Sequence, residues 1–196
     1  MEVAGRRQGA MMEHGHASGG DKRMGLLIAV LALCLALVET GAKSNQTATL
    51  TENVNTNDLW SFYQARTVRE TIATIAAEQA ELTKLVADPA AQAAIEVQQK
   101  AWRDRAARWA DDPKGGDGRK QLAEKAKHSE EVRSHSAAKY HLYEYSAAAF
   151  QVAIVVVSAS VVVGFNLLKW GGVVLAGVGL VLGVLGFAAP ELLHLG

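Results

Sequence analysis

Apolar residues concentrate in three stretches of the chain, and the residues between them are largely polar. The stretches cover residues 24–38, 147–168 and 170–189. The second and third contain no formally charged side chain, and Lys169 is the only charge between them. A helix rises about 1.5 Å per residue, so roughly 20 residues cross the ~30 Å apolar core of a bilayer. The pattern predicts a transmembrane hairpin with spans at 146–169 and 170–189.

The first apolar stretch is shorter and is interrupted by Glu39. Lys22 and Arg23 precede it, which is typical of both signal peptides and short membrane helices. If Glu39 lies at the membrane interface, the helix can extend to Ala42 and is then long enough to span. We expect an uncleaved anchor over 24–42, with a cleaved signal as the alternative.

The polar region 43–145 divides at two breaks. Asp88 and Pro89 form a typical helix start, and the "DDPKGGDG" sequence at 111–118 is typical of a loop. These breaks predict helices over 47–87, 90–110 and 119–145, the last continuing into the membrane. The remaining ends, 1–23 and 190–196, are expected to be tails, the first polar and disordered.

The first of these helices carries a long stripe of mostly apolar residues. Its members recur at spacings of three and four, as in the contact seam of a coiled coil. They are Leu50, Val54, Asn57, Ser61, Ala65, Val68, Ile72, Ile75, Gln79, Leu82 and Val86. A weaker stripe runs along the third helix from Leu122 to Phe150. We expect the two stripes to face each other.

Helix lengths favour one arrangement of this region. The outgoing arm, 42–88, would rise roughly 70 Å, and the two returning helices roughly 30 and 40 Å. The expected fold is therefore all-α: a membrane protein with three transmembrane helices and a long antiparallel, coiled-coil-like helical hairpin outside the membrane. Its tip would lie at Pro89. A shorter three-helix bundle is the alternative.

Aromatic residues cluster in the sequence "NDLWSFYQART" at 57–67. On a helical wheel these rings lie nearly opposite the apolar stripe. If the returning arm covers the stripe, the aromatic side needs another partner, either part of a three-helix bundle or another subunit. We expect Trp60 and Tyr63 to be buried there. The predicted interaction patch comprises Leu59, Trp60, Phe62, Tyr63, Gln64 and Arg66.

Several sequence blocks resemble one bacterial family. They are "TATLTENVNTNDLWSFYQARTVRET", "GRKQLAEKAK", "YHLYEYSAAAFQVAIVVVSAS" and "GFAAPELLHL". From about Met24 onward the chain is similar to the family catalogued as domain of unknown function 4337, and its most specific part here is Trp60 with the Tyr63–Arg66 segment. The resemblance implies an integral membrane protein with three spans and a coiled helical middle region, and it implies no activity. Glu39 departs from the apolar anchor expected for the family.

The last predicted span is rich in glycine. Small residues allow membrane helices to approach closely. We expect Gly172, Gly179, Gly183 and Gly186 to pack either within the membrane hairpin or between subunits. The hairpin has no ionisable side chain at mid-membrane, which disfavours a transporter or pump.

Composition narrows the candidate chemistry. Twenty basic and twenty acidic residues balance, so no nucleic-acid partner is expected. The single cysteine, Cys34, excludes an intrachain disulfide. The "EHGH" sequence at 13–16 lacks a scaffold, and the aspartates of the 111–118 loop lack the ligand spacing of an EF-hand. We expect no metal, no cofactor and no enzymatic activity, because a helical stalk offers no concave site.

Basic residues precede the first apolar stretch, and only Lys43 follows it closely. The positive-inside rule therefore places the N-terminus in the cytoplasm of a bacterium and the middle region outside its cytoplasmic (inner) membrane, in the periplasm of a Gram-negative cell. Three hypotheses for function follow. The first is a structural or interaction protein, anchored in the lipid bilayer, that forms a homo-oligomer or binds another membrane or envelope protein. The second is an accessory sensor or regulatory subunit of a larger complex, and the third is a small channel.

Overall fold

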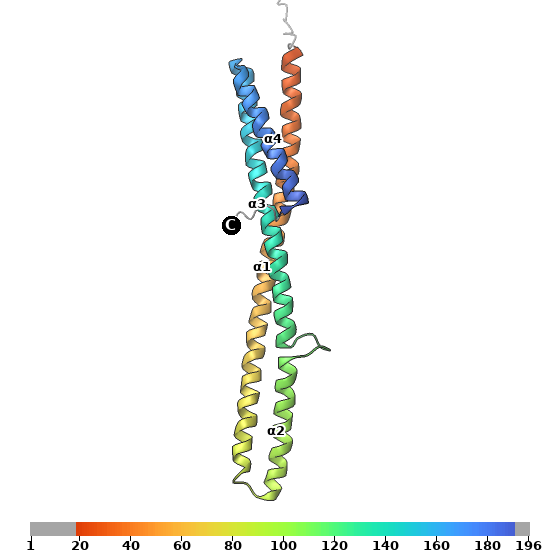
Figure 1. Ribbon diagram of the computed structural model, residues 1–196, viewed down its shortest axis with the longest axis vertical. Coiled ribbons are helices and arrows are strands. Elements are labelled where there is room, and N and C mark those ends of the chain that lie inside the picture. Colours follow the sequence, from red (N-terminus) through yellow and green to blue (C-terminus); the bar gives the residue numbers. More distant parts are fainter. Residues whose placement is uncertain (1–18, 191–196) are drawn as a thin grey trace, which may run out of the picture.

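The computed structural model describes residues 19–190, which form four helices. They are α1 (Gly19–Lys84), α2 (Pro89–Ala110), α3 (Arg119–Val163) and α4 (Asn166–Ala188). Helix α1 runs the length of the molecule, α2 and α3 follow one another back along it, and α4 folds back beside the end of α3 (Figure 1). The fold is thus all-α, and the predicted long antiparallel hairpin is present, with α1 as one arm and α2 with α3 as the other.

Helix α1 has 66 residues and is longer than expected. The anchor predicted at 24–42 and the stalk helix predicted at 47–87 are one unbroken helix. The strongest helix breaker near their junction is Gly41, and a single glycine does not end a helix. The helix also begins at Gly19, inside the tail predicted over 1–23. Residues 1–18, with the "EHGH" sequence, and residues 191–196 lie outside the described part of the chain.

Local sequence explains both breaks in the stalk. Asp88 caps α2 by accepting a hydrogen bond from the Ala91 amide at 2.8 Å, and Pro89 occupies the first helical turn. In the 111–118 loop, Asp112 accepts from the Gly115 amide at 2.9 Å, which lowers the pKa of the Asp112 carboxyl. Gly116 has a φ of 70°, and a Cβ on Gly118 would lie 2.4 Å from the Asp112 nitrogen. The loop therefore has a fixed shape and requires glycine at these positions.

The turn between the last two helices lies five residues before its predicted position. Gly164 ends α3 in the left-handed conformation with φ 68°, and its amide bonds to the Ser160 carbonyl at 3.0 Å. Lys169, expected in the turn, lies within α4. The single charge was a poor guide to the turn, because a lysine continues a helix easily, whereas Gly164 can adopt the left-handed conformation that ends one.

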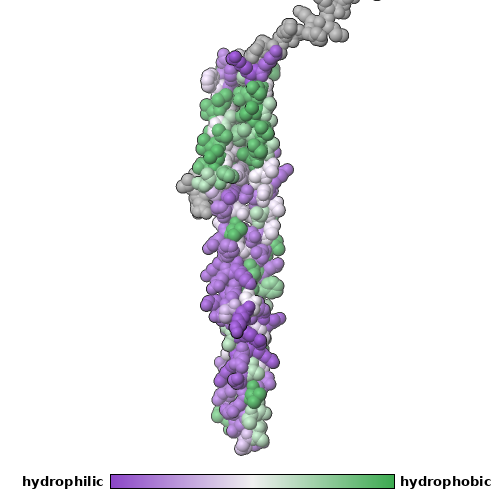
Figure 2. Space-filling view, turned by 90° about the vertical axis from the view of Figure 1, so that its right-hand side faces the viewer, coloured by the Kyte–Doolittle hydropathy of each residue, from purple (hydrophilic) through white to green (hydrophobic). Residues whose placement is uncertain are grey.

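Among residues 19–190, three helices are long and apolar enough to cross a membrane: α1 from Lys22 onward, α3 and α4. Their apolar parts gather at one end of the molecule, and the rest of the visible surface is mostly hydrophilic (Figure 2). Leu31 of α1 packs here with Phe150, Ala153 and Val157 of α3 in a small buried core. Glu39, which interrupts the first apolar stretch, accepts a hydrogen bond from Gln151 at 3.1 Å.

The face of α1 that meets the returning arm is opposite to the predicted one. The stripe from Leu50 to Val86 is exposed, whereas Thr56, Ala73, Ala77 and Ala80 are buried. The prediction that the stripe packs on the returning arm is therefore wrong. The predicted stripe of α3 does face α1, and its buried members include Leu122, Ala126, Ser129, Ser136, Ala147 and Phe150.

Regular spacing favours this face along the whole stalk, and small side chains favour it near the tip. The buried face of α1 follows positions 52, 56, 59, 63, 66, 70, 73, 77, 80 and 84, which alternate steps of four and three throughout. The apolar stripe instead takes two consecutive steps of four, at 57, 61 and 65, which breaks its heptad pattern. Ala73, Ala77 and Ala80 on the buried face also let the two helices approach closely near the tip.

Candidate interaction surfaces

The aromatic patch of α1 is partly covered by the chain itself. Trp60 and Tyr63 are partly buried, and their rings contact each other edge to face with centroids 5.3 Å apart. The Trp60 Nε1 donates a hydrogen bond to Glu130 Oε1 of α3 at 2.9 Å. Such a bond satisfies the polar edge of the indole while its apolar body is packed. The element that covers these rings in the described structure is α3 of the same chain.

Charged groups extend this contact toward the loop. The Arg119 guanidinium lies 6.0 Å from the Tyr63 ring centroid and forms an ion pair with Glu70 at 3.3 Å. Arg66 pairs with Asp117 of the 111–118 loop. These contacts fix the junction of α2 and α3 against the middle of α1.

The six residues of the predicted patch therefore do not act as one surface. Leu59, Trp60, Tyr63 and Arg66 are partly buried on the side of the returning arm. Phe62, with 62% of its surface exposed, and Gln64 point away from it. The sequence predicted a second partner for the side that carries Trp60 and Tyr63, whereas these two rings lie against α3 of the same chain.

A polar layer lies one turn closer to the apolar end of the molecule. Thr56 Oγ1 donates to Ser129 Oγ at 2.9 Å, and Ser129 Oγ donates to Glu52 Oε2 at 2.6 Å. Both hydroxyl residues are buried. The Ser129 bond, followed by one from Asn55, lowers the pKa of Glu52. Buried polar contacts of this kind allow only one register between two helices.

A second polar contact joins α1 to α2 near the tip. Gln99 is buried and its Nε2 donates to the Ala77 carbonyl at 2.9 Å and to Glu81 Oε2 at 2.5 Å. The bond from Gln99 is the main cause of a lowered pKa at Glu81. Lys84 pairs with Glu96 at 2.5 Å, and this bond raises the pKa of Lys84. Gln99 was not among the contacts predicted from the sequence. It nevertheless completes the alternation of four- and three-residue steps through Ile95, Trp102, Ala106 and Trp109.

The exposed stripe is the main apolar surface of the described stalk. We use this name for the apolar side chains that lie opposite the buried face, on α1 and the turn after it. They are Leu50, Val54, Val68, Ile72, Ile75, Leu82 and Val86, each between 47% and 88% exposed. Apolar side chains of this kind interrupt the otherwise hydrophilic stalk surface (Figure 2). Exposed apolar patches on a folded protein commonly mark a binding surface.

The predicted glycines of α4 pack against α3 of the same chain. A Cβ on Gly172 would lie 2.5 Å from Val157 Cγ2, and one on Gly179 would lie 3.3 Å from the Phe150 ring. Gly183 and Gly186 similarly approach Ser146 and Leu142. The Ser146 hydroxyl donates to the Gly179 carbonyl at 2.7 Å. Of the two alternatives for these glycines, the described structure places them within the membrane hairpin.

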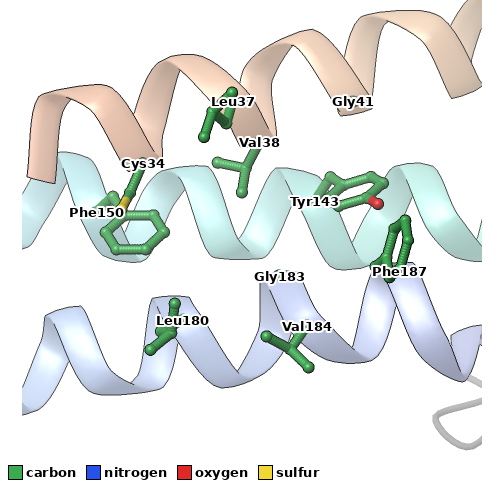
Figure 3. Close-up of a pocket in the computed structure, with 10 residues that line it drawn as sticks. All are labelled: Cys34, Leu37, Val38, Gly41, Tyr143, Phe150, Leu180, Gly183, Val184 and Phe187. Carbon is green, nitrogen blue, oxygen red and sulfur yellow. The ribbon is translucent and has the colours of Figure 1, made fainter.

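An apolar pocket of about 320 Å³ lies between α1, α3 and α4. Cys34 and Phe150 lie at one end, and Tyr143 and Phe187 at the other, near Gly41 (Figure 3). Its remaining lining residues are Leu37, Val38, Leu180, Gly183 and Val184. It arises because α4 packs mainly on α3 and meets α1 only slightly.

Within residues 19–190, no group of His, Cys, Asp and Glu side chains is arranged to hold a metal ion. The loop aspartates already have partners, since Asp117 pairs with Arg66 and Asp112 accepts from Gly115.

Comparison with known proteins gives one match. A family model described as "Domain of unknown function (DUF4337)" matches residues 20–189, which run from the first turn of α1 to the end of α4. Neither the curated proteins nor the solved structures yielded a match.

Proposed function

Because the chain belongs to the DUF4337 family, whose description assigns no activity, we propose a function from the arrangement of its helices. The protein is a membrane-anchored helical scaffold, structural and not catalytic, that holds an interaction surface away from a bilayer. It acts by associating with itself or with another membrane or envelope protein.

One observation carries this proposal: three membrane-length helices lie together at one end of a long hairpin whose far part bears the exposed stripe. Helix α1 alone would extend roughly 100 Å, of which about 60 Å lies beyond the anchor. A rigid hairpin of this length separates a surface from the membrane by a fixed distance. The exposed stripe does not stabilise the single chain, because apolar side chains contribute to stability only when they are removed from water.

We propose the cytoplasmic membrane of a bacterium as its location, with the N-terminus and the α3–α4 turn inside and the stalk outside. The charge bias around the first span supports this orientation. In the structure, the start of α1 and the α3–α4 turn lie at the same end, as three spans require (Figure 1).

Fractionation combined with thiol labelling tests the anchor and its orientation. In full-length protein with Cys34→Ala, we expect it to stay in the membrane pellet after an alkaline wash. Thr74→Cys, in the stalk, should react with an impermeant thiol reagent in intact cells. Phe165→Cys, in the turn, should react only after the membrane is broken. Release of the protein by the wash would refute the membrane anchor.

The unbroken length of α1 favours one alternative to the scaffold function. A single helix of 66 residues joins the membrane end to the stalk near its tip, so a displacement at one end could be passed to the other. This arrangement suits an accessory sensor or regulatory subunit. Purification from native membranes in mild detergent separates the two proposals. A stoichiometric enzyme or transporter partner favours the regulatory subunit, and its absence favours the scaffold.

A further inference from the structure

The distal half of the exposed stripe has the geometry of a coiled-coil seam. On α1, Ala65, Ile72 and Gln79 recur every seven residues, and Val68, Ile75 and Leu82 form the second row. This is the spacing of the two core positions of a heptad. Gln79 is the one long polar side chain among them, a feature that selects register in coiled coils.

The described part of the chain leaves this seam uncovered. Ala73, Ala77 and Ala80, on the opposite side of α1, face the returning arm. Val68, Ile72 and Leu82 remain 57%, 62% and 68% exposed. The occupant of the seam must therefore come from outside residues 19–190 of this copy.

A second copy of the chain fits the seam because of how α1 is anchored. We rely here on the membrane anchor proposed above. Two copies in one bilayer have the same orientation, so their α1 helices are parallel and the same residues lie at the same height. A two-fold axis along the membrane normal then places Ile72 opposite Ile72 and Gln79 opposite Gln79, which is the symmetry of most dimers.

Charges beside the seam permit this pairing. In a parallel coiled coil, each flanking residue faces the residue five positions later in the other helix. Glu78 of one copy then faces Thr83 of the other, Gln64 faces Arg69, and Thr71 faces Ala76. No two like charges meet. The buried face of α1 carries Arg66, Glu70 and Lys84 instead, which already have partners within the chain.

The seam supplies part of the area that a stable dimer needs. Burial of a Val, Leu or Ile side chain removes on the order of 100 Å² from water, so Val68, Ile72, Ile75 and Leu82 offer roughly 400 Å² per copy. Stable interfaces bury about 800 Å² per partner. Contacts between the membrane segments of the two α1 helices would add to this area.

We propose that the distal half of the exposed stripe, over residues 65–84 of α1, pairs with the same segment of a second copy, forming a parallel, in-register coiled coil between two stalks. Each stalk keeps its own hairpin, so α1 lies between its own returning arm and the α1 of the other copy. The proposal names the partner of the scaffold as the protein itself.

Cysteine crosslinking in native membranes tests the pairing. Single cysteines replace Val68, Ile72, Ile75 or Leu82 in the full chain with Cys34→Ala. Thr74→Cys and Gln98→Cys, both exposed but off the seam, are the matched controls. Under mild oxidation we expect the seam positions to give several-fold more disulfide-linked dimer than the controls. Equal crosslinking at all positions, or none at the seam, would overturn the proposal.

A charge substitution gives a second, independent measurement. Ile72→Lys together with Ile75→Lys should convert the dimer in mild detergent to a monomer, as measured by light scattering. Circular dichroism should be unchanged, because both side chains are exposed in the single hairpin. Thr74→Lys should leave the dimer intact. A dimer that survives the double substitution would overturn the pairing.

The same samples separate this inference from the proposed scaffold. Protein that leaves the membrane on alkaline washing refutes the anchor itself. Protein that stays in the membrane but crosslinks from position 72 only to a different protein overturns the self-pairing and leaves the scaffold standing.

Discussion

At the residue scale, neighbouring aromatic side chains of α1 have different surroundings. Trp60 is partly buried and bonds to Glu130 of α3, whereas Phe62 is exposed. Truncation of a buried large side chain to alanine removes the stability gained by its burial, whereas truncation of an exposed side chain costs little stability. We expect Trp60→Ala to lower the free energy of unfolding by about 2 kcal/mol and Phe62→Ala by less than about 0.5 kcal/mol. Denaturant unfolding in detergent, followed by circular dichroism, measures both. Equal losses would contradict the assignment of Trp60 to the hairpin contact.

Gln99 and Gln98 offer a similar comparison in α2. Gln99 is buried and bonds to Ala77 and Glu81, whereas Gln98 is exposed. Loss of a buried amide and its bond to the Ala77 carbonyl costs roughly 1 to 2 kcal/mol, so Gln99→Ala should destabilise the tip while Gln98→Ala should not.

The pH dependence of this contact provides a further check. Gln99 lowers the pKa of Glu81 in the folded chain, so this contribution is present above the ordinary carboxyl pKa and is lost as the pH falls through the folded value. The stability difference between wild type and Gln99→Ala should therefore shrink on acidification below about pH 4. A difference that is constant with pH would contradict the bond to Glu81.

At the element scale, the sequence defined where helices begin and end better than which face each one buries. The Asp88–Pro89 pair and the 111–118 loop are local sequence signals, and the helices of the stalk are interrupted at both places. The faces of α1 could not be chosen in the same way, because both carry steps of three and four over most of their length. Hydrophobicity favoured Ile72 and Leu82, whereas close approach of two long helices favoured Ala73, Ala77 and Ala80. Gln99 and Glu130 could not be identified as partners of α1, because pairing across the hairpin depends on register.

Glycine packing between α3 and α4 is also a property of elements. A methyl group on Gly172 would lie 2.5 Å from Val157 Cγ2 and 3.2 Å from the Ala153 carbonyl oxygen, whereas one on Gly171 meets nothing within 4 Å. We expect Gly172→Ala to destabilise the membrane hairpin by about 1 to 3 kcal/mol through overpacking. Gly171→Ala should be neutral or slightly stabilising, because alanine favours helix. Thermal unfolding in detergent distinguishes them, and equal midpoints would argue against tight packing at Gly172.

At the scale of the whole molecule, the two arms of the stalk must match in length. The 111–118 loop is tied to α1 through Arg66, and the tip is tied by Lys84 with Glu96, so α2 has a fixed place between them. Any change in one arm displaces every pair beyond it unless the other arm changes equally. The stalk can therefore be shortened only in steps that remove facing segments from both arms.

A paired deletion tests this requirement. Removal of residues 74–80 from α1 together with residues 98–104 from α2 takes one facing heptad from each arm, because Glu81 lies beside Gln99 and Arg103. We expect a cooperatively folded stalk shortened by about 10 Å, visible by electron microscopy of detergent-solubilised particles. Removal of 74–80 alone should lower the unfolding temperature much further, since it separates Lys84 from Glu96 and leaves Gln99 buried without Ala77. If the single-arm deletion is as stable as the paired one, the two arms are not packed in a unique register along their length.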